Sequence, residues 1–211
     1  METYQVIILA IIQGITEFLP ISSSGHLVLL PRVFGWPDQG IFLDVAVHVG
    51  SLGAVLVYFW RDVLKIFFGF LSLLRGKVTP GGQLFLMLLI GTLPVVFVGF
   101  ILDRLGMQKF RSLEVVAFAL IGWGSVMFIA DRLGRVEKSI KDVHAFGAFL
   151  IGIAQSLALI PGTSRSGICM SAMRFLGFKR EDAARFSFLL AIPAITGAGG
   201  LKIFDAVQSG V

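Results

Sequence analysis

Long apolar segments separated by short polar connections run along almost the whole chain. The segments at residues 41–60, 84–102 and 113–130 each approach the roughly 20 apolar residues that a helix needs to cross a bilayer about 30 Å thick. Residues 183–204 form a further apolar segment of similar length. This pattern predicts a polytopic membrane protein made of helices, without a soluble domain.

Shorter apolar segments flank two polar interruptions. Residues 4–19 have a helical pattern but are too short to span a membrane, and residues 27–34 follow the first interruption. Residues 143–160 lead into the second interruption, and residues 168–178 follow it. Ile66–Leu74 is expected to be an interfacial or half-crossing segment.

The two interruptions resemble each other. Their cores read Ser-Ser-Ser-Gly at residues 22–25 and Ser-Arg-Ser-Gly at residues 164–167, a separation of 142 positions. Because three predicted spans lie between them, equivalent parts enter from opposite membrane faces. We therefore predict an all-α polytopic fold with inverted repeats, whose two re-entrant helix–loop–helix hairpins meet in the bundle. The chain is interpreted as one integral membrane domain, residues 1–211, with repeat one at about 1–75 and repeat two at about 143–211.

Composition supports the membrane assignment. Hydrophobic residues make up 56% of the chain and charged residues 15%, and the mean hydropathy is +0.88. The net charge of +5 is assigned to loops that contact membrane lipids, and no nucleic acid is expected as a partner because no basic stripe is interleaved with exposed aromatic residues. The Lys and Arg bias of the loops favours an orientation in which residues 61–77, 132–141 and 179–180 share one face.

The first interruption brings acid–base groups together. Gln13 and Glu17 are spaced i, i+4 and therefore share one helical face directly before Pro20. A buried carboxylate needs a cation, a metal or a proton as its partner. His26 follows the serines and the glycine at the expected start of the next short helix. These groups indicate a functional site rather than simple packing.

Both interruptions carry groups suited to anions. Serine hydroxyls can cap the following helices, and the backbone N–H groups at such helix starts bind anions. Arg165 adds a planar fork of donors that matches phosphate oxygens. The expected substrate-binding set is Gln13, Ser22, Ser24, Gly25, Ser164, Ser166 and Gly167. The combination predicts phosphoryl transfer or pyrophosphate hydrolysis.

These motifs resemble the undecaprenyl pyrophosphate phosphatase family of bacterial membrane enzymes, which is associated with bacitracin resistance. The resemblance rests on Gln-x-x-x-Glu with Phe-Leu-Pro-Ile-Ser-Ser-Ser-Gly-His and on Pro-Gly-Thr-Ser-Arg-Ser-Gly downstream, and it covers essentially the whole chain. It implies hydrolysis of a C55 prenyl pyrophosphate lipid to the monophosphate and inorganic phosphate. It also implies a site that opens to the outer face of the bacterial cytoplasmic membrane.

By the same resemblance, Glu17 is the essential acid, His26 the motif histidine, Ser23 a candidate nucleophile and Arg165 the pyrophosphate-binding residue. Mg²⁺ or Ca²⁺ is expected as a cofactor near Glu17. The nucleophile stays open between Ser23, a water and His26. The proton acceptor stays open between Glu17 and His26. The sequence also leaves the oligomeric state open, a homo-oligomer included.

Two departures and two alternatives qualify the resemblance. Cys169 stands where the family usually has a threonine, and family chains continue through roughly two more spans, so the chain is interpreted as a fragment or a shortened homologue. A type 2 phosphatidic acid phosphatase is disfavoured, because no histidine follows Arg165 before the next loop. A membrane carrier or flippase for prenyl phosphate or another anion is the alternative from a different class.

The remaining polar and aromatic residues receive structural interpretations. Asp44 and His48, spaced i, i+4, are expected to pair with each other in a packing or supporting role rather than to bind a metal. Trp36, Trp60 and Trp123 mostly fit interface belts. Cys169 is expected to be a small packing residue.

Overall fold

The computed structural model describes residues 1–105, 112–134 and 137–209. Helices occupy most of these ranges, and the only β pairing within them is an isolated bridge between Lys138 and Phe178. The elements are α1 (Thr3–Thr16), α2 (Ser23–Phe34), α3 (Gly40–Tyr58), α4 (Trp60–Leu74), α5 (Pro80–Arg104), α6 (Leu113–Leu133), η2 (Ile140–Asp142), α7 (Ala145–Ser156), η3 (Leu157–Leu159), α8 (Arg165–Phe175) and α9 (Arg180–Ser209).

Two of the predicted spans are confirmed as continuous helices. Helices α5 and α6 are long and apolar enough to cross a membrane over Pro80–Leu102 and Leu113–Leu133. The span predicted at 41–60 instead belongs to a bent pair, because α3 and α4 meet at an angle of 85°. Residues 66–74, predicted as an interfacial or half-crossing segment, belong to α4, the second helix of this bent pair.

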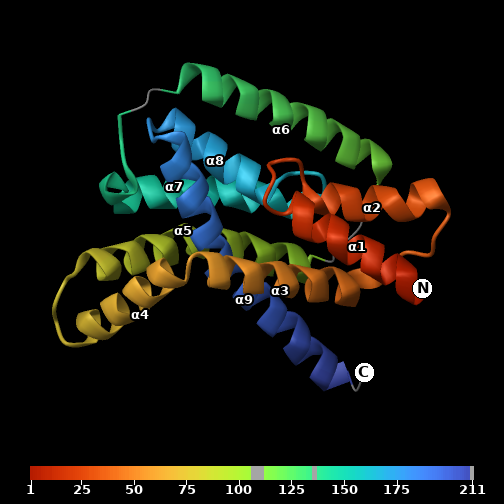
Figure 1. Cartoon of the computed structure of the whole chain (residues 1–211), viewed down its shortest axis with the longest axis horizontal. Helices are drawn as coiled ribbons and strands as arrows, with labels where there is room; N and C mark the ends of the chain where they lie inside the picture. Colours follow the sequence, from red (N-terminus) through yellow and green to blue (C-terminus); the bar gives the residue numbers. More distant parts are fainter. Residues whose placement is uncertain (106–111, 135–136, 210–211) are drawn as a thin grey trace.

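The short helices are arranged around the two polar interruptions. Figure 1 places α6 along one side of the molecule and α3, α4 and α5 along the opposite side, with α1, α2, α7 and α8 between them. Helix α9 crosses from the level of α8 past α3 and α5, and it packs against all three. Both polar loops therefore lie inside the bundle, with α6 on one side and α3 on the other.

The best-packed part of the molecule lies around α8 and α9. Met173, Phe178, Phe186, Leu189 and Leu190 are fully or almost fully buried there. Helices α5 and α7 cross closely beside this core, because Gly152 lies directly against the backbone of Gly91. Cys169 is completely buried, which confirms its interpretation as a packing residue.

The helices that follow the two loops begin earlier than their apolar patterns predict. Helix α2 begins at Ser23 rather than near residue 27, and α8 begins at Arg165 rather than near residue 168. The reason is local capping, because the hydroxyls of Ser22 and Ser164 accept hydrogen bonds from Gly25 N–H and Gly167 N–H. Each loop thus joins two short helices, whereas the inverted relation of the two repeats stays a prediction.

Candidate active site

The two loops meet through an arginine and a glutamate that are 148 positions apart in sequence. The Nη2 atom of Arg165, at the start of α8, donates to Oε1 of Glu17 over 2.6 Å. Glu17 is the C-cap of α1 and is 7% exposed, and the Arg165 side chain is 18% exposed. Gly167 lies beside Pro20 at the same junction, since a Cβ added to Gly167 would be 3.4 Å from Pro20 Cβ.

The other carboxylate oxygen of Glu17, Oε2, accepts two further hydrogen bonds. Ser23 Oγ donates to Glu17 Oε2 over 2.6 Å, and Gln13 Nε2 donates to the same atom over 3.0 Å. The contact between Gln13 and Glu17 confirms that the i, i+4 pair shares a face. An arginine, a hydroxyl and an amide thus surround the buried carboxylate and supply the hydrogen bonds that a buried charge requires.

Helix α3 contributes two residues to this cluster. His48 Nε2 lies 3.6 Å from Glu17 Oε2, and Ser51 Oγ lies 3.5 Å from Gln13 Nε2. The other ring nitrogen of His48, Nδ1, is 2.7 Å from the backbone carbonyl of Asp44. Because a carbonyl only accepts, Nδ1 carries a hydrogen, and this bond directs Nε2 at Glu17.

The two helix starts are capped in the same way. Ser22 Oγ and Ser24 Oγ are 3.2 Å apart at the first loop, and Ser164 Oγ and Ser166 Oγ are 3.2 Å apart at the second. Ser22 has a φ of 62°, a left-handed conformation that is uncommon for residues other than glycine. Strain of this kind is typical of sites where the surrounding bonds hold the backbone in place.

His26 takes part in holding Ser22 in place. Its Nδ1 atom lies 2.8 Å from the backbone carbonyl of Ser22, and its backbone N–H donates to the same carbonyl over 3.3 Å. Within the described part of the chain, no hydrogen bond or ion pair joins the His26 ring to Glu17, Ser23 or Arg165. The histidine that the structure brings to Glu17 is therefore His48.

One guanidinium nitrogen of Arg165 has no hydrogen-bond partner among the described residues. This nitrogen is Nη1, and it is buried. Nη2 is already fixed by Glu17, so the guanidinium plane is oriented while Nη1 stays free to donate. A buried donor without a partner is costly, so Nη1 is a candidate contact for a ligand or a water.

Comparison with known proteins gives a consistent picture. The model of the family described as bacitracin resistance protein BacA matches residues 6–210. The chain belongs to the BacA family. An undecaprenyl-diphosphatase of Teredinibacter turnerae is 50% identical over 210 residues, which cover 99% of this chain and 80% of that protein. An undecaprenyl-diphosphatase of Roseobacter denitrificans is 49% identical over 209 residues, covering 98% of this chain and 78% of that protein.

Membership in the BacA family agrees with the resemblance read from the two loop motifs. The structure places the motif residues Glu17, Ser23 and Arg165 in direct contact. The predicted substrate-binding residue Gln13 contacts Glu17, while Ser22, Ser24, Ser164 and Ser166 contact each other around the two helix starts. Gly25 and Gly167 provide the N–H groups that the cap serines accept.

The described side chains around Glu17 do not form a metal site of their own. No group of three or more His, Cys, Asp or Glu side chains that could hold a metal occurs in the described ranges. Mg²⁺ is commonly bound through one or two carboxylates together with substrate phosphates and several waters. A site in which the protein alone supplies the ligands does not fit the described residues around Glu17, because both of its oxygens already accept hydrogen bonds from Arg165, Ser23 and Gln13.

His48 and Ser51 are the site residues that the sequence interpretation did not place beside Glu17. They are three residues apart and therefore share one face of α3. His48 does pair with Asp44, as expected, through a contact between Nδ1 and the Asp44 backbone carbonyl. The polar i, i+3 pair within an apolar helix is the signal that marks this face as turned toward other polar groups.

Proposed function

We propose that the chain hydrolyses undecaprenyl pyrophosphate to undecaprenyl phosphate and inorganic phosphate, which recycles the carrier lipid of cell-wall synthesis. BacA family membership and the undecaprenyl-diphosphatase relatives support this activity. The geometric observation that carries the proposal is the contact series from Ser23 through Glu17 to Arg165, which ends in a free guanidinium donor.

Arg165 and the two helix starts bind the pyrophosphate in this proposal. The free Nη1 donates to a phosphate oxygen, while Nη2 remains on Glu17 and keeps the guanidinium oriented. The starts of α2 and α8 add the positive ends of two helix dipoles. Positioning and charge neutralisation supply most of the acceleration in phosphoryl transfer.

Ser23 is the nucleophile that the geometry favours. Its hydroxyl already donates to Glu17 Oε2 over 2.6 Å, so the carboxylate takes the proton as Ser23 Oγ attacks the terminal phosphorus. The bond from phosphorus to the bridging oxygen breaks, and undecaprenyl phosphate leaves. Water then attacks the phosphorus of the phosphoserine and releases inorganic phosphate. The proton held by Glu17 returns to Ser23 Oγ.

Trapping the phosphoenzyme separates this route from the two alternatives. Acid quench of the purified chain during turnover of substrate labelled at the terminal phosphate gives an acid-stable phosphoserine at Ser23. An acid-labile phosphohistidine at His26 contradicts the serine route. Under the water route no labelled protein forms, and Ser23→Ala keeps substantial activity.

The cation belongs to the same proposal. Glu17 would hold Mg²⁺ or Ca²⁺ together with phosphate oxygens and waters, and the bound cation would neutralise phosphate charge. We expect EDTA to abolish phosphate release and added Mg²⁺ to restore it. Full activity in EDTA after dialysis contradicts the requirement.

The location and orientation can be tested with cysteines. The membrane-spanning helices support a membrane protein, and we propose the bacterial cytoplasmic membrane with the site open to its outer face. In a Cys169→Ala background, an impermeant maleimide added to intact cells should label Asp38→Cys but not Ser139→Cys, which lie in connections predicted on opposite faces. The reverse pattern contradicts the proposed orientation.

The central experiment measures phosphate release from undecaprenyl pyrophosphate by the purified chain in detergent with Mg²⁺. We expect release by the parent and loss in Arg165→Ala and Glu17→Ala. The matched controls Arg32→Ala and Glu181→Ala alter exposed residues and should match the parent. A folded parent that binds the lipid without releasing phosphate contradicts the proposal.

A further inference from the structure

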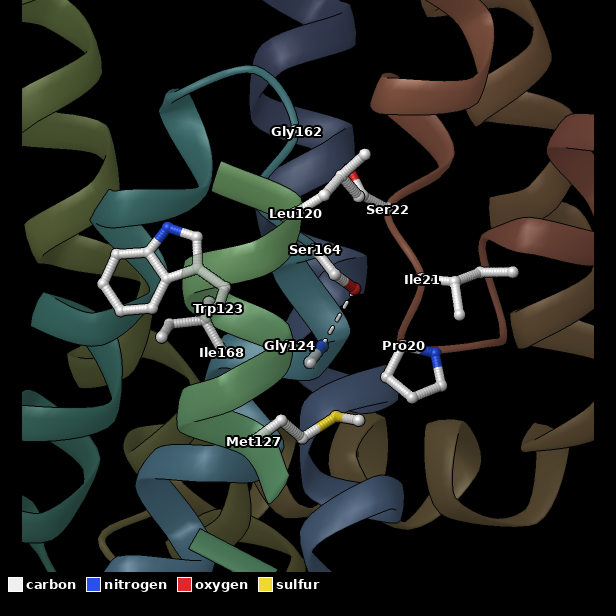
Figure 2. Close-up of a pocket in the computed structure, with 11 residues that line it drawn as sticks. Pro20, Ile21, Ser22, Leu120, Trp123, Gly124, Met127, Gly162, Ser164 and Ile168 are labelled. Carbon is white, nitrogen blue, oxygen red and sulfur yellow. Dashed lines mark hydrogen bonds between the residues drawn. The ribbon is translucent and has the colours of Figure 1, made fainter. Parts of the chain in front are cut away.

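A cavity of about 260 Å³ lies between the two loops and α6. Figure 2 shows Leu120 and Met127 reaching from α6 toward the first loop, where Pro20, Ile21 and Ser22 lie. The second loop and the start of α8 close another side with Gly162, Ser164, Gly167 and Ile168. Trp123 and Gly124 complete the lining on α6.

Both loops are seated against α6 next to this cavity. A Cβ added to Gly162 would lie 2.7 Å from the carbonyl oxygen of Val116, and one added to Gly25 would lie 3.6 Å from Leu120. Gly162 also has a φ of 91°, which side-chain-bearing residues rarely adopt. Helix α6 therefore forms a wall that contacts both loops.

The chemistry of the cavity is apolar. Pro20, Ile21, Leu120, Met127 and Ile168 provide its hydrocarbon surface together with Trp123. Its two hydroxyls, on Ser22 and Ser164, already accept from Gly25 N–H and Gly167 N–H and contact Ser24 and Ser166. None of the lining residues carries a charge and most of them are apolar, so the cavity suits a hydrocarbon better than a phosphate group.

The residues that contact Glu17 occupy the neighbouring positions of the same loops. Ser22 lines the cavity while Ser23 bonds Glu17, and Ser164 lines it while Arg165 bonds Glu17. Consecutive Cα atoms are about 3.8 Å apart, so the cavity begins within one residue of the proposed reacting groups. In each loop, therefore, one residue lines the cavity and the next residue contacts Glu17.

We propose that this cavity holds the isoprene units nearest the pyrophosphate and thereby selects prenyl pyrophosphates. The inference rests on the proposed function, because it assigns the lipid part of that substrate. The volume is somewhat below the roughly 300 Å³ at the lower end of pockets that enclose whole small ligands. The cavity therefore encloses only the beginning of a C55 chain, and the rest lies outside it.

Two glycines of α6 provide a matched test. Gly124 lines the cavity, whereas Gly122 is not among its lining residues. A Cβ added at either position meets nothing within 4 Å, so neither backbone position excludes a side chain at its first atom. Replacing either glycine with leucine also raises helix propensity. The two variants should therefore fold alike and differ in the space left inside the cavity.

The kinetic experiment uses farnesyl pyrophosphate, a soluble prenyl pyrophosphate, with the purified chain in detergent and Mg²⁺. We expect Gly124→Leu to raise KM about tenfold or more, because leucine fills the space of a branched hydrocarbon. Gly122→Leu should match the parent. Parent-like KM in Gly124→Leu, or an equal rise in both variants, overturns the inference.

A binding experiment makes the result independent of turnover. A farnesyl pyrophosphate analogue with a diazirine on its first isoprene unit is photolysed with the parent and both leucine variants, and labelled peptides are mapped. We expect label on residues 120–127 or 20–22 in the parent and in Gly122→Leu, and its loss in Gly124→Leu.

The two experiments separate the inference from the proposed function. Label in the cavity without phosphate release supports the lipid site and contradicts the hydrolase. Phosphate release with label elsewhere, for example on lipid-facing side chains alone, supports the hydrolase and overturns the cavity assignment.

Discussion

At the residue scale, Glu17 organises three side chains around one buried carboxylate. Arg165 donates to one oxygen, and Ser23 and Gln13 donate to the other. Charge-assisted hydrogen bonds of this kind are roughly twice as strong as neutral ones. The arrangement fixes the loop that carries Ser23 relative to the loop that carries Arg165, as the proposed attack of Ser23 on a phosphate held by Arg165 requires.

Replacing Arg165 with lysine should lower kcat/KM about 100-fold or more, because an ammonium cannot hold Glu17 and a phosphate oxygen with two fixed donors. The measurement is phosphate release by purified Arg165→Lys, with thermal unfolding to verify the fold. Turnover close to that of the parent would contradict a contact between Arg165 and the phosphate.

His48 is expected to be a positioning residue that acts through Glu17. His48→Leu should lower kcat about tenfold while KM stays within twofold, because the carboxylate loses a neighbour that orients it. His48→Gln should recover part of kcat, since its amide can donate to Glu17. The control His144→Leu alters an exposed residue at the start of α7. Equal losses of kcat in His48→Leu and His48→Gln would contradict a positioning role for a polar side chain beside Glu17.

At the element scale, the crossing of α5 and α7 depends on small residues. A Cβ on Gly152 would lie 2.4 Å from the carbonyl oxygen of Gly91 and 2.9 Å from Pro94. Close approach of helix backbones at small residues is a common way to pack helices in membranes. Helix α7 leads through η3 into the second loop, which carries Arg165 at the start of α8.

Gly152→Ala should lower the free energy of unfolding by about 1–3 kcal/mol, because the backbones must separate to admit the methyl group. Gly53→Ala in α3 is the matched control, since a Cβ there meets nothing within 4 Å. The control should be neutral or more stable by about 0.5–1 kcal/mol. Thermal and denaturant unfolding in detergent measure both, and equal stabilities would contradict the tight crossing.

At the scale of the whole molecule, Arg174 joins α8 to the end of α6 and to the connection before α9. Its guanidinium donates to the backbone carbonyls of Phe178, Asp131 and Gly134 over 2.6, 3.2 and 2.9 Å. The side chain is 5% exposed. Arg180 binds the Asp131 carboxylate from outside through two hydrogen bonds.

Arg174→Met should destabilise the fold by about 3 kcal/mol, because three carbonyls lose a charged donor within a buried junction. Arg180→Gln is the contrasting variant, and little change is expected because the pair is exposed and screened by solvent. Thermal unfolding midpoints of Arg174→Met and Arg180→Gln test whether the two variants differ in stability. Similar midpoints would show that the junction does not depend on the buried guanidinium.

The apolar pattern indicated most of the elements, because helix formation in an apolar environment follows from local sequence. Spans α5 and α6 and the short helices on either side of each loop follow this pattern. The bend between α3 and α4 was not predicted, since residues 41–60 read as one apolar segment and no proline marks Phe59.

By itself, the sequence determined the membrane class, the two polar loops and the chemical character of Glu17, Ser23 and Arg165, because those properties depend on residue type and local spacing. Only the tertiary structure decided which histidine reaches Glu17, since His48 arrives on α3 from a distant part of the chain. It also decided that Trp123 lies beside a cavity formed by both loops and α6. These outcomes depend on long-range packing, which residue spacing within one segment does not encode.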